Sequence, residues 1–129
     1  MRVKIEQIAQ SGGIYKIYFS HSLCGVFLSL PNSAQVGASV QINFKASEAM
    51  ISKKPLEISA ENEMLAKILG IKFGEILTNI SLSAFDEKVK FDIITTTSSA
   101  QNLGICVGDE IYAYINASAI YIEKIDDKD

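Results

Sequence analysis

The chain has 129 residues, of which 48% are hydrophobic and 21% charged, and its formal net charge is −3 at pH 7. This length suits one domain or two very small ones. The acidic balance argues against a nucleic-acid-binding protein, which relies on a basic face, and no apolar run reaches the roughly 18 residues of a membrane-spanning helix. We therefore expect neither nucleic acid nor a membrane as a partner.

Strands are predicted along most of the chain, because apolar residues alternate with polar ones. In chain order the alternating apolar positions are Tyr15, Ile17 and Phe19; Val40, Ile42 and Phe44; Ile80 and Leu82; Val89, Phe91 and Ile93; and Ile111, Ala113 and Ile115. Glycine, proline and acidic residues separate these runs and mark turns. Five or so short strands in each half predict an all-β fold of small barrels.

Helical structure is expected only in short turns. The segment Ser98–Leu103 begins with hydroxyl residues that can cap a helix, and Gly104 can end it. The segment Glu61–Leu69 favours a helix by intrinsic propensity. We nevertheless predict a strand at Met64–Ile71, because it matches Val3–Ile8 at an offset of 63 residues.

The chain contains an internal repeat. Val36–Lys53 (VGASVQINFKASEAMISK) and Val107–Lys124 (VGDEIYAYINASAIYIEK) align without a gap at an offset of 71 residues, which indicates two copies of one small unit. The change of offset predicts about eight additional residues in the second half, near Asp86–Lys88 and the threonine- and serine-rich segment that follows. We expect a shorter, diverged module at 1–54 and a second module at 55–129, joined by the connector Ser52–Glu57.

The residues that could carry chemistry are few. Cys24 and Cys106 lie far apart among apolar neighbours, which favours free, buried thiols in a reducing compartment; a single disulfide is the alternative. No apolar segment of a signal peptide follows the N-terminus, so we expect a cytoplasmic protein. No catalytic arrangement stands out, and His21 has no Cys or carboxylate at metal-ligand spacing. We therefore expect neither an enzyme nor a metal site.

Four segments together carry a resemblance to a known family. They are Ile58-Ser59-Ala60-Glu61-Asn62; Thr96-x-x-Ser99-Ala100-x-x-Leu103-Gly104-Ile105; Gly108 with the strand that follows it; and Lys45-Ala46-Ser47, which recurs in altered form as Asn116-Ala117-Ser118. In this order and spacing they resemble the Mop, or TOBE, family of molybdate-binding modules, in a tandem (di-Mop) arrangement. The first half is the weaker match, because it lacks the Ser-Ala-x-Asn opening.

This resemblance implies two tandem five-stranded small barrels of the oligonucleotide/oligosaccharide-binding (OB) type, with short helical turns. It implies molybdate or tungstate as a bound oxyanion, and a homo-oligomer, a trimer or dimer, with sites between modules. We expect a free-standing protein for storage or homeostasis of the oxyanion. The alternative is a regulatory or oligomerisation module of a molybdate/tungstate transporter or sensor system, with a degraded anion site.

The residues that the resemblance implies for oxyanion binding are Ser59, Glu61, Asn62, Thr96, Ser99, Lys45, Ala46, Ser47, Asn116, Ala117 and Ser118. Hydroxyl, backbone N–H and ammonium groups can satisfy the four acceptor oxygens of a tetrahedral dianion. Structural roles are the alternative: Thr96 and Ser99 as helix caps, Lys45 as a solvated lysine. Ser59 and Asn62 can likewise form only a turn.

Glu61 departs from the family pattern, which usually has an arginine there. A carboxylate that faces a dianion costs binding energy, so either Glu61 points away from the anion or this site is altered or lost. Together with Asn116, where the pattern has lysine, it favours the regulatory alternative. A binder of single-stranded nucleic acid that stacks bases on Tyr112, Tyr114 and Tyr121 is a third hypothesis, and the acidic balance disfavours it.

Overall fold

A computed structural model describes residues 1–126, and the end of the expected second module, residues 127–129, lies outside the described residues. In chain order its elements are β1 (Arg2–Ser11), β2 (Ile14–Phe19), η1 (Ser20–Ser22), β3 (Cys24–Phe27), β4 (Ser39–Asn43), η2 (Ala46–Glu48), β5 (Met50–Ser52), β6 (Asn62–Phe73), β7 (Leu77–Ala84), β8 (Val89–Thr96), α1 (Thr97–Leu103), β9 (Glu110–Ile115), η3 (Ala117–Ala119) and β10 (Tyr121–Ile125), where η marks a 3-10 turn. The predicted strand at β6 is confirmed over the helix that propensity favours. The helix capped by hydroxyl groups is confirmed as α1, and Gly104 ends it in the left-handed conformation with φ of 63°.

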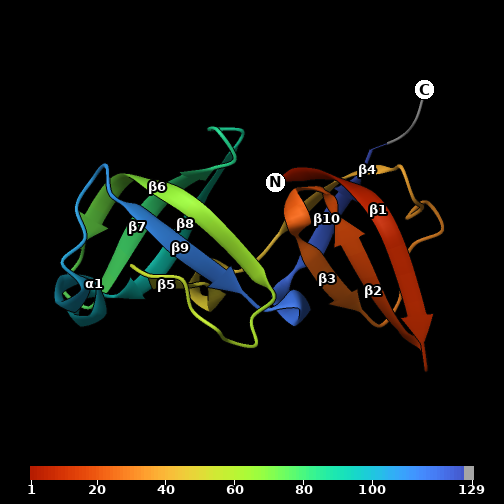
Figure 1. Cartoon of the computed structure of the whole chain (residues 1–129), viewed down its shortest axis with the longest axis horizontal. Helices are drawn as coiled ribbons and strands as arrows, with labels where there is room; N and C mark the ends of the chain where they lie inside the picture. The colour runs from red at the N-terminus through yellow and green to blue at the C-terminus, as the bar shows by residue number, and fades with distance from the viewer. Residues whose placement is uncertain (127–129) are drawn as a thin grey trace.

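Across residues 1–126 the strands form two five-stranded sheets, with the orders β10-β4-β1-β2-β3 and β5-β9-β6-β7-β8. We call them the first and second barrel; they lie side by side along the long axis (Figure 1). The expected all-β class with two small OB-type barrels is therefore confirmed. None of the helices in this part of the chain is long and apolar enough to cross a membrane.

The two barrels exchange one strand. β10, at the end of the second repeat, pairs with β4 in the first barrel, and β5, at the end of the first repeat, pairs with β9 in the second barrel. The short turns η2 and η3 precede the exchanged strands. Each barrel therefore contains one strand from the other half of the sequence. The two sheets are not confined to residues 1–54 and 55–129. The division of the chain into two modules at these bounds stays a prediction.

The internal repeat is visible in the strand pairing. The register of β1 against β2 shifts between Ile5 and Gln7, and that of β6 against β7 shifts between Ile68 and Gly70, at the predicted offset of 63. Such bulges bend a strand, which allows the sheet to curl. The segments β4-η2-β5 and β9-η3-β10 repeat at the predicted offset of 71.

The additional residues of the second half enter at two places. Ile17 pairs with Gly25 in the first barrel, and Ile80 pairs with Ile93 at the equivalent place in the second, so the offset rises from 63 to 68 across the β7–β8 hairpin. It rises to 71 where α1 replaces the loop that follows β3. Both places are those that the sequence predicts.

Aromatic contacts join the barrels. The ring of His21 in η1 stacks on Phe85 of the β7–β8 hairpin with 4.4 Å between centroids. Phe44, just after β4, meets Phe91 of β8 edge-on at 5.7 Å. Most of the buried apolar residues of both barrels belong to one connected cluster. The exchange of strands and this shared core make the two repeats one packed unit.

Candidate functional site

The start of β6 is fixed to the first barrel by Asn62. Its side chain is fully buried; Oδ1 accepts a hydrogen bond from the backbone N–H of Cys24 at 2.7 Å, and Nδ2 donates to the backbone carbonyl of Cys24 at 2.9 Å. Because β3 is an edge strand, these two backbone groups would otherwise lack partners. The amide of Asn62 therefore completes the edge of β3 and is fully used within the fold.

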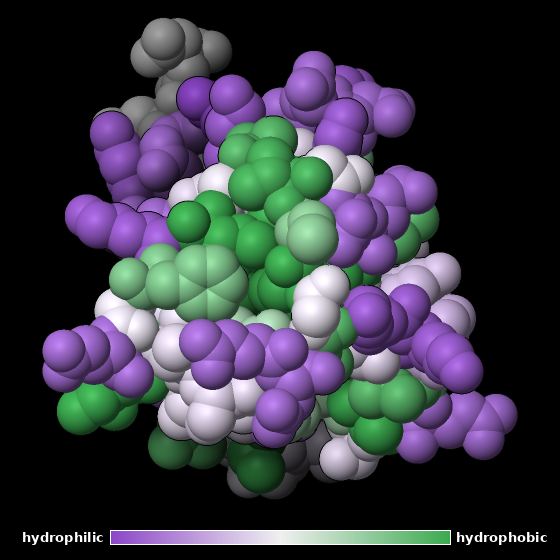
Figure 2. Space-filling view, turned by 90° about the vertical axis from the view of Figure 1, so that its left-hand side faces the viewer, coloured by the Kyte–Doolittle hydropathy of each residue, from purple (hydrophilic) through white to green (hydrophobic). Residues whose placement is uncertain are grey.

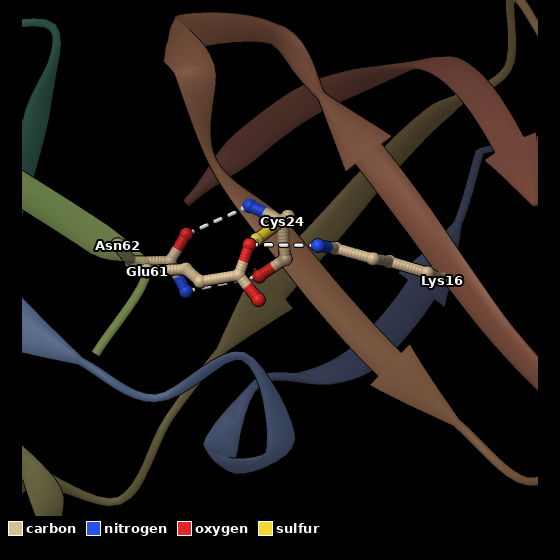
Figure 3. A network of polar contacts seen from close by, with 4 residues as sticks. All are labelled: Lys16, Cys24, Glu61 and Asn62. Carbon is tan, nitrogen blue, oxygen red and sulfur yellow. Dashed lines mark hydrogen bonds and ion pairs between the residues drawn. The ribbon is translucent and has the colours of Figure 1, made fainter. Parts of the chain in front are cut away.

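Glu61, next to Asn62, forms an ion pair between the barrels (Figure 3). Its Oε2 lies 2.7 Å from Nζ of Lys16 on β2 and 3.6 Å from the thiol of Cys24. The hydrogen bond from Lys16 lowers the pKa of Glu61, and the same bond raises the pKa of Lys16. Both groups are therefore held in their charged forms, and the carboxylate does not stand unpartnered at this place.

Ser59 and η3 complete a first group of predicted residues, which we call the junction group: Ser59, Glu61, Asn62, Asn116, Ala117 and Ser118. Asn62 pairs with Ile115 in the sheet, so the residues that follow Ile115 lie beside the start of β6. Ser59, Asn116 and Ser118 are exposed, whereas Ala117 is buried. The turn η3 also packs against β3, so the junction group and Cys24 share one corner of the molecule.

A second group, which we call the helix group, lies at the second barrel: Lys45, Ala46, Ser47, Thr96 and Ser99. The turn η2 packs against β8, which ends at Thr96. The Oγ1 of Thr96 accepts a hydrogen bond from the backbone N–H of Ser99 at 3.2 Å and donates to the hydroxyl of Ser99 at 2.8 Å. Thr96 is thus the helix cap, and Ser99 reaches a pocket of about 410 Å³ that Ala49 and Thr95 also line.

The structure places the predicted residues in these two groups and relates them by the internal repeat, because η2 and η3 are equivalent turns. In each barrel the turn lies against the strand that ends the sheet, β8 or β3. Sequence reasoning missed Lys16 and Cys24, which contact Glu61. No signal in the sequence marks them, since they lie in ordinary strand positions 45 and 37 residues away.

The alternation of Ile111, Ala113 and Ile115 predicts that Tyr114 points outward, and this prediction is wrong. Its side chain is 2% exposed, and its hydroxyl donates to Oε2 of Glu63 and accepts from the backbone N–H of Leu56, both at 2.7 Å. Burial raises the pKa of Tyr114, and the hydrogen bond to Glu63 adds to this effect. The connector folds over the ring, so Tyr114 cannot stack on a nucleic-acid base, which removes part of the basis for that hypothesis.

Both cysteines are free, and Cys24 is buried as expected, but the expectation of burial is wrong for Cys106. Burial raises the pKa of the Cys24 thiol, and the nearby Glu61 carboxylate adds to the rise. The thiolate is the reactive form, so at pH 8 we expect a thiol reagent to modify Cys106 quickly and Cys24 slowly. Mass spectrometry of a time course, with Cys106→Ser as control, checks this; equal rates at both thiols would contradict the structure.

Within residues 1–126 no group of three or more His, Cys, Asp or Glu side chains is placed to hold a metal ion. The arrangement instead offers hydroxyls, amides and a few lysines around two exposed 3-10 turns. Such groups donate hydrogen bonds and suit an anion better than a cation.

Comparison with known proteins finds one solved structure with the same fold and one protein of similar sequence. The chain has the fold of a solved structure described as the cytoplasmic molybdate-binding protein ModG with molybdate bound, with a TM-score of 0.81 over 94% of this chain and 92% of that chain. The sequence identity is 18%, so this likeness shows the fold alone. No family model matches the chain.

The chain is also 33% identical, over 98 residues or 76% of its length, to the molybdate/tungstate import ATP-binding protein WtpC of Pyrococcus abyssi (strain GE5 / Orsay). The match covers 27% of that protein. The chain thus spans about a quarter of the length of this curated relative.

Proposed function

We propose that the chain is a tandem Mop/TOBE-type protein that binds molybdate or tungstate in the cytoplasm, for storage or homeostasis, without catalysing a reaction. The observation that carries this proposal is the shared fold, over almost the whole chain, with a molybdate-bound ModG. The sequence similarity to an import protein for the same two oxyanions supports it independently. Isothermal titration calorimetry with molybdate, tungstate and sulfate tests it, and we expect the first two to bind.

The chemistry of the two groups fits this proposal. A tetrahedral dianion needs donors from several directions, and the exposed Ser59, Asn116 and Ser118 offer them in the junction group, as Ser99 and Lys45 do in the helix group. A hydrogen bond to a charged acceptor contributes roughly 1.5–3 kcal/mol. We propose both groups as parts of oxyanion sites.

The helix group gives a prediction with an internal control. Ser99→Ala removes a hydroxyl donor, and we expect it to weaken molybdate binding about tenfold or more while the free energy of unfolding barely changes. Thr96→Ala should also weaken binding, and in addition cost about 1 kcal/mol of stability, because Thr96 caps α1. Calorimetry and urea unfolding measure the two effects. Unchanged affinity in both variants would remove the helix group from the site.

We propose further that the chain forms a homo-oligomer. At the end of the second barrel Phe73, Ile76 and Leu77 are 53%, 77% and 54% exposed, and Figure 2 shows apolar side chains gathered on this end face. The equivalent positions of the first barrel are Gln10, Gly13 and Ile14, of which only Ile14 is a large apolar residue and 46% exposed, so the end of the second barrel is the more apolar of the two. Apolar surface of this kind is typical of an interface. Sedimentation should give a dimer or trimer, and a monomer at micromolar concentration would contradict this.

The second candidate is a regulatory or oligomerisation module of an oxyanion transporter with a degraded site. The sequence similarity to about a quarter of a transporter ATP-binding protein favours this candidate. The Lys16–Glu61 pair also favours it, because Glu61 neutralises the positive charge that Lys16 would otherwise offer to an anion. The titration separates the two candidates, because a degraded module should bind neither molybdate nor tungstate.

A further inference from the structure

The ion pair between Lys16 and Glu61 links the first barrel to the junction group. The Glu61 carboxylate accepts from the Lys16 ammonium at 2.7 Å, and the Cys24 thiol lies 3.6 Å from the same oxygen (Figure 3). A carboxylate oxygen that receives two donors in this way stands where an oxygen of a free oxyanion could stand. The two donors come from the first barrel, and the carboxylate comes from the start of the second.

The backbone of Glu61 is held in place by its neighbour. The next residue, Asn62, is fixed to Cys24 by two hydrogen bonds and is fully buried, so the backbone of Glu61 cannot move far. Its side chain is 48% exposed, however, and that of Lys16 is 30% exposed. Exposed ion pairs contribute little to stability, so the carboxylate can leave Lys16 at little cost while its backbone stays in place.

The pair lies at the corner of the molecule that carries the junction group. Lys16 pairs with Val26 across β2 and β3, and η3 packs against β3. The strand β3 and the end of η3 lie close together, because a Cβ atom at Gly25 would come within 3.3 Å of Ile120, the residue directly after η3. Ser59 and Glu61 both precede β6 by a few residues. The junction group and the ammonium of Lys16 therefore lie at the same corner of the molecule.

We propose that Lys16 is an oxyanion-binding residue and that Glu61 is its tethered competitor, which the oxyanion must displace. This inference rests on the proposed oxyanion binding and assigns a control element to the same site. While the pair is closed, the dianion meets no net positive charge there. When Glu61 turns to solvent, the ammonium becomes a donor, and a doubly charged oxyanion replaces the single charge of the carboxylate.

A double-mutant cycle with molybdate tests this proposal: calorimetry at low salt on the wild type, Glu61→Gln, Lys16→Gln and the double variant. Glu61→Gln should tighten binding about fivefold, because it frees Lys16 and removes a negative charge. In the Lys16→Gln background the same change should give about a twofold gain at most, since only the repulsion is then relieved. Lys16→Gln in the Glu61→Gln background should weaken binding about fivefold or more.

The size of the coupling between the two substitutions shows whether Glu61 competes with the oxyanion for Lys16 or only repels the oxyanion. Equal gains from Glu61→Gln in both backgrounds would show simple repulsion and overturn the role of competitor. No loss from Lys16→Gln in the Glu61→Gln background would overturn the role of Lys16. If no variant binds molybdate or tungstate, the proposed function fails and this inference fails with it; if the wild type binds and the gains are equal, only this inference fails.

The ion pair between Arg2 and Asp126 provides matched controls. Asp126→Asn and Arg2→Gln change the net charge by the same amounts as Glu61→Gln and Lys16→Gln, so they measure the effect of charge on its own. We expect both controls to shift molybdate affinity less than twofold. A control that tightens binding as much as Glu61→Gln does would attribute the gain to net charge and overturn the proposal.

Discussion

Replacing Asn62 with alanine should destabilise the protein by roughly 2–4 kcal/mol, because two buried backbone groups of Cys24 lose their only side-chain partner. The change also leaves a small cavity at the boundary of the barrels. Urea unfolding followed by circular dichroism measures the loss. Typical domains have 5–15 kcal/mol in total, so a loss of this size is readily detected.

Asn116→Ala is the matched control. Asn116 precedes η3, is exposed, and makes no capping hydrogen bond with its side chain. Its removal should change the free energy of unfolding by less than about 0.5 kcal/mol. Equal effects of the two substitutions would show that Asn62 is not the link between β6 and β3 that the structure describes.

The exchange of strands predicts a crossed response to two equivalent substitutions. Ile122 in β10 pairs with Ile42 of the first barrel, and Ile51 in β5 pairs with Ala113 of the second. A carboxylate placed on either half-buried strand should cost roughly 2–4 kcal/mol. Native-state hydrogen exchange should then show Ile122→Asp loosening mainly β4 and β1, and Ile51→Asp loosening mainly β9 and β6.

Each variant serves as the control for the other, because the two residues occupy the same place in the repeat. If the strands were not exchanged between the barrels, β5 and β10 would each pair within the sheet of its own half. Each substitution would then loosen its own repeat. That uncrossed pattern is the result that would contradict the pairing. Hydrogen exchange must be measured for each strand separately, because the shared core couples the total stability of the two barrels.

The sequence predicts the elements of this fold better than their partners. Alternation and the two offsets locate most of the strands and the additional residues of the second half. They cannot predict the exchange, because β5 and β10 carry similar apolar patterns that would suit either sheet. The choice depends on the path of the few residues around η2 and η3 and on non-local packing such as Phe44 against Phe91.

At the candidate site, too, the sequence predicts local features but not contacts between distant residues. Thr96 as a helix cap and Gly104 as its end follow from local rules, and both are confirmed. The Lys16–Glu61 pair joins residues 45 apart in the sequence, so no local pattern marks it. Tyr114 lies on the outward phase of β9, and it is buried only because the connector near Leu56 folds over it, which alternation does not anticipate.

Native mass spectrometry of the protein with molybdate, tungstate and sulfate tests the central proposal most directly, because it counts bound oxyanions and subunits together. We predict an oligomer that gains the mass of molybdate or tungstate in fixed stoichiometry and gains no sulfate at the same concentration. An assembly, or a monomer, that gains neither molybdate nor tungstate under these conditions would contradict the proposal that this chain is an oxyanion-binding protein.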